Sequence, residues 1–377
     1  MDSYRGVRTA LIVGAGMAGL TAAIALARDG WQVEVAEAAP TRAAAGWGLC
    51  LTGPSLRALD ELGLADTCLA EGYGMSTITH VYVDGEPAGE TQLPRLIGAG
   101  RPAAAGIARP VLHRILYEEA ERCGVVIRHQ VTAAAVEQDQ EGELVRVRLS
   151  DGTVRQVALL VGADGVKSSV RGLLGFETSL DYHGLMIWRA LVPRPPWASG
   201  IHQFAGKADT AGIVPISDSQ AYVFLTENGA ERSALPDAEL APRMRRLLES
   251  FSGRVQEMRS LVSASESVVR RPMLTTFLEG GWNRGNGVVI GDAAHAPAPH
   301  MASGAALAIE DGLVLARELG RHGSVGAGLQ AFVDRRTQRC RTLVETSVAI
   351  VGLEQAQQYR EMYPLVDSCH RLMAEPV

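Results

Sequence analysis

Hydrophobic runs and helical spacing at the start of the chain predict a strand, a helix and a second strand. Residues 9–13 are apolar throughout, as in a buried parallel strand. Residues 20–28 have helical spacing and are rich in alanine, which favours a helix. Residues 31–36 alternate into a second strand that ends at Glu37. Such a strand–helix–strand unit of about thirty residues is what a right-handed crossover between parallel strands requires.

Further along, helices alternate with short strands, and the pattern then changes. Helical spacing predicts helices over 54–64, 110–123, 238–251, 304–319 and 329–351. Strand-like runs occupy 125–127, 145–149, 157–161 and 287–290. Residues 75–100 alternate in hydrophobicity, and about 181–270 contain isolated strands and proline-rich turns, which is typical of antiparallel sheets. We therefore expect an α/β fold with a discontinuous nucleotide-binding domain (1–75, 101–178 and 271–345), an inserted substrate domain (76–100 and 179–270) and a C-terminal helical segment (346–377).

The composition is that of an ordinary globular enzyme. Of the 377 residues, 47% are hydrophobic and 21% are charged, and the formal net charge is −6. This charge argues against nucleic acid or an anionic membrane as the main partner. The five cysteines are scattered without a C-x-x-C pair, so we expect neither a disulfide framework nor a zinc site. No apolar run approaches the roughly 20 residues of a membrane span, and no signal peptide is expected before the first strand, so we expect a cytoplasmic protein.

A glycine-rich turn links the first strand to the first helix. It reads Gly14-Ala-Gly16-Met17-Ala18-Gly19. Glycines at these positions let the backbone approach a pyrophosphate, and the positive end of the helix dipole favours the phosphate charge. Glu37 follows Gly19 by eighteen residues, which places it to accept hydrogen bonds from an adenosine ribose. The turn predicts a dinucleotide site but does not distinguish FAD from NAD.

Two later turns distinguish FAD from NAD. Asp164-Gly165 follows an apolar strand and precedes a helix, although a simple capped strand–helix junction would look the same. Gly291-Asp292 repeats this arrangement, and its carboxylate can bind the ribityl hydroxyls that NAD lacks. Pro297 and Pro299 stiffen the next loop. The helix that begins at Ser303, Gly304 and Ala305 would bring backbone N–H groups to the pyrimidine end of a flavin.

These motifs resemble the para-hydroxybenzoate hydroxylase family of single-component FAD-dependent aromatic monooxygenases (group A flavoprotein hydroxylases), from residue 9 to about residue 343. The resemblance implies a Rossmann-like FAD-binding domain of the glutathione-reductase type with an inserted, mainly antiparallel β-sheet substrate domain and C-terminal helices. It also implies that Asp164-Gly165 lies near the pyrophosphate and that Gly291-Asp292 binds the ribityl chain. The remaining flavin-binding positions that it implies are Arg42, Gly48, Arg109 and Ala133.

The resemblance further implies the reaction. NAD(P)H reduces the FAD, molecular oxygen adds to give a flavin C4a-hydroperoxide, and one oxygen atom passes to an electron-rich ring. The expected substrate is a small aromatic or N-heteroaromatic compound, and the expected enzyme is a monomer or homodimer. Two alternatives stay open: a two-component oxygenase or epoxidase fed by a separate reductase, and a non-catalytic flavin-fold protein that binds an aromatic ligand. A halogenase would need a W-x-W-x-I-P motif, which Trp188 to Pro193 does not supply.

One stretch departs from the family's pattern. Where the family has aromatic-Gly-Gly-Gln-Gly-Ala-Asn, this chain has His300-Met-Ala-Ser303-Gly304-Ala-Ala306, so the asparagine that commonly contacts the flavin is missing. We take His300, next to Pro299, as the candidate catalytic position. It could contact the substrate or relay a proton, or it could be a loop histidine bonded to backbone. His295 is expected to be structural.

The substrate wall is expected in the inserted sheet. Alternation places His202 and Phe204 on one face of a strand, and Tyr222 and Phe224 on one face of another. Arg189 could pair with a substrate carboxylate or with a surface acid. The candidates, each of which could equally pack in the core, are Trp188, Arg189, His202, Phe204, Pro215, Tyr222 and Phe224. On the last long helix, a solvated face is expected for Arg335, Arg336, Arg339 and Arg341.

Overall fold

The computed structural model describes residues 8–41, 47–82, 87–138, 143–207, 209–229 and 231–377. Its first layer is a six-stranded sheet in the order β18-β19-β12-β1-β2-β8. The chain segments in this sheet are Asn283–Arg284, Gly287–Val289, Leu159–Gly162, Thr9–Val13, Gln32–Glu37 and Val126–His129. All neighbours pair in parallel except β18 and β19. Strands β1 and β12 are almost completely buried, which explains why their sequences are continuous apolar runs.

Helices cover this sheet and carry its loops. Helix α1 (Met17–Arg28) packs against α4 (Arg109–Arg122) and α8 (Ser303–Arg321). A smaller antiparallel sheet, β11-β10-β9, lies beside the strands; its segments are Val154–Val157, Val145–Leu149 and Ala133–Gln138. The short helix α5 (Ser169–Leu173) follows β12. The large core cluster joins α1, α8 and the six-stranded sheet, so the loops at the carboxyl ends of β1 and β12 have rigid supports.

The second layer is an eight-stranded sheet in the order β20-β17-β13-β16-β15-β14-β5-β6. Its segments are His295–Ala296, Val268–Phe277, Asp181–Pro193, Gln220–Asn228, Thr210–Pro215, Ile201–Ala205, Thr77–Val81 and Pro87–Gln92. All pairs are antiparallel except β14 with β5. Helices α6 (Asp237–Leu248) and α7 (Arg254–Leu261) cover one face of this sheet and share a hydrophobic cluster with it. The predicted fold class, a nucleotide-binding α/β unit with an antiparallel sheet and C-terminal helices, is confirmed.

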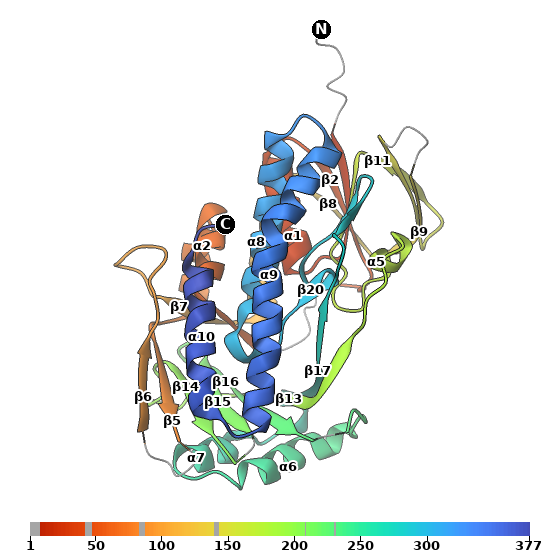
Figure 1. Cartoon of the computed structure of the whole chain (residues 1–377). Helices are drawn as coiled ribbons and strands as arrows, with labels where there is room; N and C mark the ends of the chain where they lie inside the picture. Colours follow the sequence, from red (N-terminus) through yellow and green to blue (C-terminus); the bar gives the residue numbers. More distant parts are fainter. Residues whose placement is uncertain (1–7, 42–46, 83–86, 139–142, 208, 230) are drawn as a thin grey trace.

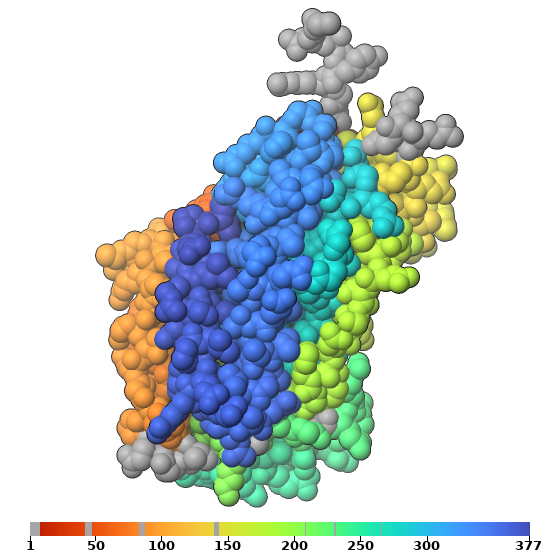
Figure 2. All heavy atoms as spheres, in the orientation of Figure 1, coloured from red at the N-terminus to blue at the C-terminus, as the bar shows by residue number. Residues whose placement is uncertain are grey.

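Two long helices complete the chain. Helix α9 (Val325–Gln355) runs alongside α8, and α10 (Tyr359–Ala374) turns back beside α9 and beside strands β5 and β6 (Figure 1). In the space-filling view, α9 and α10 form the central part of this face (Figure 2). Three further segments, β3 (Gly48–Leu51), β7 (Ala104–Ala108) and β4 (Tyr73–Met75), form a small sheet near α2 (Gly53–Glu61) and α3 (Ala65–Glu71). None of the helices in the described part of the chain combines the length and the hydropathy needed to span a membrane.

Candidate active site

The glycine-rich turn between β1 and α1 has the geometry of a phosphate-binding loop. Gly14 has a φ of +106° and packs directly on the backbone of Ala163 at the end of β12, so a side chain would be strained there. A Cβ on Gly19 would overlap the carbonyl oxygen of Gly14. A Cβ on Gly16 would meet no protein atom within 4 Å and would project into empty space. The turn therefore leaves room for a ligand at the start of α1.

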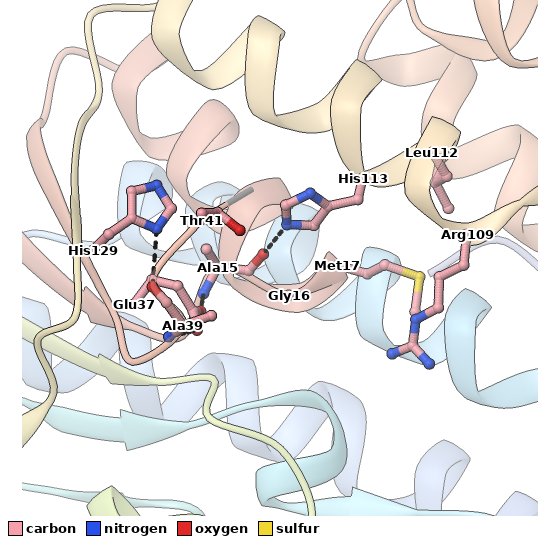
Figure 3. A pocket seen from close by; sticks show the side chains of 10 residues that line it. All are labelled: Ala15, Gly16, Met17, Glu37, Ala39, Thr41, Arg109, Leu112, His113 and His129. Atoms are coloured by element: carbon pink, nitrogen blue, oxygen red, sulfur yellow. Dashed lines mark hydrogen bonds between the residues drawn. The ribbon is translucent and has the colours of Figure 1, made fainter. Parts of the chain in front are cut away.

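A pocket of about 220 Å³ begins at this turn (Figure 3). The carboxylate of Glu37 is fixed there by two backbone amides: Ala15 N donates to Oε2 at 2.6 Å and Ala39 N donates to Oε1 at 2.7 Å. The imidazoles of His113 and His129 contact the carbonyl oxygens of Ala15 and Ala39 at 2.9 and 3.1 Å. A carboxylate held in this way keeps free lone pairs for hydroxyl donors. Arg42, the next predicted position along this loop, lies outside the described residues.

A larger cavity of about 470 Å³ shares Gly16, Met17 and Arg109 with the first pocket, so the two form one continuous site. Ten of the predicted cofactor-binding residues line this cavity: Gly16, Met17, Ala18, Gly48, Arg109, Gly165, Asp292, Pro299, Gly304 and Ala305. Segments from both ends of the chain thus meet around one elongated space, which fits a long ligand such as FAD.

Other predicted cofactor-binding residues do not line the large cavity. Asp164 accepts hydrogen bonds from Ser168 Oγ and from the backbone amides of Ser169 and Val170 (2.7 and 3.1 Å), and so caps the start of α5. Ser303 is completely buried, and its hydroxyl has no hydrogen-bond partner among the described residues. Ala133 does not line either pocket; it is a buried core residue at the start of β9. Ala133 is therefore not among the residues that line the two pockets.

The Gly291-Asp292 turn rests on a buried network of charges. Gly291 has a φ of +59°, and its N–H donates to Asp311 Oδ2 at 2.8 Å. His295 Nε2 contacts the same oxygen at 2.7 Å, and Arg336 Nε donates to Oδ1 at 2.7 Å. His295, Asp311 and Cys340 come together here, but the guanidinium of Arg336 already pairs with Asp311, so these residues form a salt-bridge network and not an open metal site.

This network corrects one prediction. Arg336 is completely buried and Arg339 is nearly so, and both bind the buried carboxylate of Glu310, whereas a solvated face was expected for them. Burial opposes the charged forms, but the neighbours prevail: Cys340 and Asp311 raise the pKa of His295 to about 10. His295 and Arg336 in turn lower the pKa of Asp311 to about 2.

Arg109 lines both pockets, and Asp292 lines the larger one within electrostatic reach of Arg109. Both side chains expose much of their surface to the cavity, but the protein around the cavity partly desolvates them. This desolvation raises the pKa of Asp292, and the charges of His295 and Arg109 oppose the rise. Desolvation lowers the pKa of Arg109; the positive charge of Arg189 adds to this effect, and the negative charge of Asp292 opposes it. A second guanidinium, that of Arg189, therefore lies within electrostatic reach of Arg109.

Arg189 lies on the sheet side of the large cavity with Tyr222 and Phe224, three of the seven residues predicted for the substrate wall. The Arg189 side chain forms no ion pair or hydrogen bond with any described residue, and its Nε is buried without a partner. Ile187, Gln203 and Thr226 extend the same wall from β13, β14 and β16, and were not predicted. An unpaired cation between aromatic side chains is suited to an anionic aromatic ligand.

The other four predicted wall residues do not line the cavity. Trp188 and Phe204 are buried on the opposite face of the sheet, under α6 and α7, where Trp188 Nε1 donates to Glu227 Oε2 at 2.9 Å. His202 lies edge-on against Trp197 on that face, and Pro215 is buried beside the backbone of Gly106. The alternation was read correctly, but it cannot tell which face is inward, because both faces of this sheet are covered.

His300 lies in the short turn Pro299–Met301 just before α8 and borders the cavity. Its Nε2 contacts Oε2 of Glu354 at 2.8 Å, and Thr226 Oγ1 donates to Oε1 of Glu354 at 2.9 Å. Burial would raise the pKa of Glu354, but the hydrogen bond with His300 keeps that pKa below its usual value. The sequence left open a loop histidine bonded to backbone; in the structure, His300 instead binds the carboxylate of Glu354.

The departure from the family's glycine pattern has a local effect. Ala302, which replaces a glycine of that pattern, adopts the left-handed conformation at φ +49° and ψ +29°. This conformation costs a non-glycine residue roughly 1–2 kcal/mol. It allows the chain to turn from His300 into α8, so that Gly304 and Ala305 face the same cavity as the histidine.

Helix α10 closes the cavity and was not predicted as part of the site. Its lining residues recur with helical spacing on one face: Tyr359, Met362, Tyr363, Val366, Asp367 and His370. Tyr359 OH donates to the carbonyl of Gly206 at 3.0 Å, and the far end of α10 is held by Arg57 and Arg339 through its last carbonyls. The helical periodicity is visible in the sequence, but nothing there indicates which surface it covers.

Together, the glycine turn, the fixed Glu37 and the elongated cavity define a flavin-binding α/β protein. The family described as "FAD binding domain" matches residues 8–348, and the chain belongs to this family. It is 30% identical to aurachin C monooxygenase/isomerase of Stigmatella aurantiaca, over 91% of this chain and 88% of that protein. It is also 30% identical to 6-hydroxynicotinate 3-monooxygenase of Pseudomonas fluorescens, over 82% and 83%.

A solved structure supports the fold. The crystal structure of Klebsiella pneumoniae HpxO complexed with FAD and uric acid superposes with a TM-score of 0.87, covering 99% of this chain and 98% of that one at 22% identity. The family match and these relatives confirm the resemblance to the single-component flavoprotein hydroxylases, and the protein is an FAD-dependent monooxygenase. FAD is its cofactor, and NAD(P)H and molecular oxygen are the co-substrates of such enzymes.

Proposed function

We propose that this enzyme hydroxylates a small aromatic or N-heteroaromatic compound that carries an anionic group, and that Arg189 binds this group. The observation that carries the proposal is the unpaired guanidinium in the cavity wall, beside Tyr222 and Phe224. A carboxylate or ring oxyanion would satisfy it with charge-assisted hydrogen bonds. Relatives named for 6-hydroxynicotinate and 3-hydroxybenzoate as substrates support this class of compound.

We further propose an arrangement for the cofactor along the cavity. Backbone at Gly16 and Met17 would hold the diphosphate, Glu37 the adenosine ribose and Asp292 the ribityl hydroxyls. Backbone amides of Gly304 and Ala305 at the start of α8 would face the pyrimidine end of the flavin, where a helix N-terminus favours negative charge. Bound FAD supplies the chemistry of hydride acceptance and oxygen activation, while Arg189 and the aromatic side chains orient the ring to be hydroxylated.

The proposal is tested with FAD-loaded protein and a panel of ring-hydroxylated benzoates, nicotinates and a 4(1H)-quinolone. We expect one compound to stimulate NADH or NADPH oxidation and to yield a product heavier by one oxygen atom. Oxidation by this chain alone would exclude dependence on a separate reductase. If no compound in the panel stimulates oxidation by FAD-loaded protein, the assignment to anionic aromatic substrates fails.

Arg189→Met tests the role of the guanidinium. The loss of a charge-assisted hydrogen bond, worth about 1.5–3 kcal/mol, should raise the KM of an anionic substrate roughly 10- to 100-fold. The KM of an uncharged analogue should change little. Arg271→Met is the matched control, because Arg271 is an exposed arginine of the same sheet. An equal effect of Arg189→Met on charged and uncharged analogues would contradict the assignment.

A further inference from the structure

His300 and Glu354 form a pair that no motif of the chain indicated. His300 lies before α8, at the end of the cavity where Gly304 and Ala305 also lie. Glu354 lies near the end of α9, fully buried, with one oxygen on His300 Nε2 and the other on Thr226 Oγ1. A buried carboxylate is costly unless it is paired, and Glu354 is paired with His300. The pair therefore joins the flavin side of the cavity to the substrate sheet and to α9.

We propose that Glu354 is a positioning residue that holds His300 as the proton acceptor for the ring hydroxyl of the substrate. The inference rests on the proposed function, since it assigns a role in the hydroxylation of an ionisable ring. Removing the proton raises the electron density of the ring, which is what oxygen transfer requires.

The hydrogen bond fixes which nitrogen accepts the proton. An ionised carboxylate only accepts hydrogen bonds, so Nε2 of His300 must carry a hydrogen. The lone pair of the neutral ring is then on Nδ1, which is buried and has no hydrogen-bond partner among the described residues. A buried polar atom without a partner calls for an explanation. Nδ1 is closed to solvent in the free protein, so a substrate hydroxyl supplies the missing partner once binding moves the side chains that cover this nitrogen.

The proton transfer is balanced within the pair. The O–H bond of the substrate breaks, its electron pair stays on oxygen, and an N–H bond forms at Nδ1. The resulting imidazolium is stabilised by Glu354 through Nε2–H, in the way that a buried carboxylate orients a catalytic histidine. Among the described residues, Asp209 and Tyr359 also interact electrostatically with Glu354, and burial raises the pKa of both. Thr226 is neutral and donates to Glu354, so it keeps the carboxylate in place.

The experiment compares Glu354→Gln with wild type, using FAD-loaded enzyme and 6-hydroxynicotinate or 3-hydroxybenzoate as the probe. We expect kcat to fall about 10- to 100-fold, which is less than the roughly 10²- to 10⁴-fold that general-base catalysis contributes, because His300 itself remains; KM should change less than about threefold. Because Glu354→Gln removes a negative charge beside the proposed base, the acidic limb of the kcat/KM profile should move to lower pH. Glu345→Gln, an exposed change on the same helix, should leave kcat and the profile unchanged.

Fluorinated analogues of the probe separate positioning from a purely structural role. Their ring hydroxyls are more acidic, and an analogue that is already ionised at the assay pH needs no base. The deficit of Glu354→Gln should therefore shrink to a few-fold for that analogue. An equal deficit for every analogue with an unmoved pH profile, or no deficit at all, would overturn the inference.

A measurement on the wild-type protein does not depend on the folding of a variant. Long-range ¹⁵N–¹H spectra of ¹⁵N-histidine-labelled, FAD-loaded enzyme report the tautomer of His300, with His300→Gln identifying its signals. We expect the form with hydrogen on Nε2, and the Nδ1–H form would refute the pairing. If no probe stimulates the wild-type enzyme, the proposed function fails instead. Normal turnover by Glu354→Gln would leave the function standing and remove Glu354 from it.

Discussion

Replacing Asp311 by asparagine should destabilise the protein strongly, because this carboxylate holds the centre of the buried charge network. It accepts hydrogen bonds from Gly291 N, His295 Nε2 and Arg336 Nε at 2.7–2.8 Å, and it has no exposed surface. The fall of its pKa from 3.8 to about 2 alone corresponds to about 2 kcal/mol. In the variant, buried His295 also loses its carboxylate partner, and Arg336 keeps one carboxylate, that of Glu310, so the free energy of unfolding should drop by about 3–5 kcal/mol.

The assay is urea unfolding of FAD-loaded protein, followed by circular dichroism and by flavin fluorescence. Asp334→Asn is the matched control, since Asp334 is exposed on α9, and it should change the free energy by less than about 0.5 kcal/mol. Because the Gly291 amide loses its acceptor, Asp311→Asn should also release FAD at lower urea than the loss of helix signal. A destabilisation of less than about 1 kcal/mol would refute the view that this network supports the flavin turn.

Two further predictions follow from the same regions. The lowered pKa of Asp311 contributes stability above about pH 3.8, and this contribution is lost as the pH falls toward 2. The raised pKa of His295 contributes stability below about pH 6.5, and this contribution is lost as the pH rises through 10. The free energy of unfolding, measured against pH, should therefore fall at both ends, and a flat alkaline limb would contradict a charged His295. Gly19→Ala should give protein with little bound FAD, because the added Cβ would overlap Gly14; FAD loading is measured as the ratio of absorbance at flavin and protein wavelengths. The control Gly323→Ala, where a Cβ meets nothing within 4 Å, should bind FAD normally. Full FAD loading of Gly19→Ala would be inconsistent with a tight turn.

The nucleotide-binding half could be predicted because its constraints are local. The strand predicted at 9–13 coincides with β1, and the helix predicted at 110–123 lies within a residue of α4 at both ends. Buried parallel strands need continuous apolar runs, and a turn onto a helix N-terminus needs glycines wherever backbones touch. Both requirements concern residues that are neighbours in the sequence, so the sequence alone reveals them.

The substrate half could be predicted only in outline, because its faces are decided by distant segments. His202 and Phe204 alternate correctly, but α6 and α7 cover their face while the cavity lies on the other. Arg336 resembles an ordinary surface arginine until α8 presents Asp311 to it. Glu354 carries no motif, and its partner His300 is remote in sequence. Pairings of this kind form only when the tertiary structure brings distant segments together, so the local sequence does not predict them.

The strand order of the flavin sheet has a consequence for how the protein is made. Strand β1 pairs with β2 soon after both leave the ribosome, but its other neighbour, β12, lies beyond residue 158, and the edge of β12 is covered only by β19 at residues 287–289. Until then the nascent chain exposes apolar strand edges, which invite pairing with other chains. High contact order of this kind slows folding and favours dependence on chaperones. Chains halted before residue 287 should therefore accumulate as aggregates that take up no flavin, even though the complete glycine turn is already present.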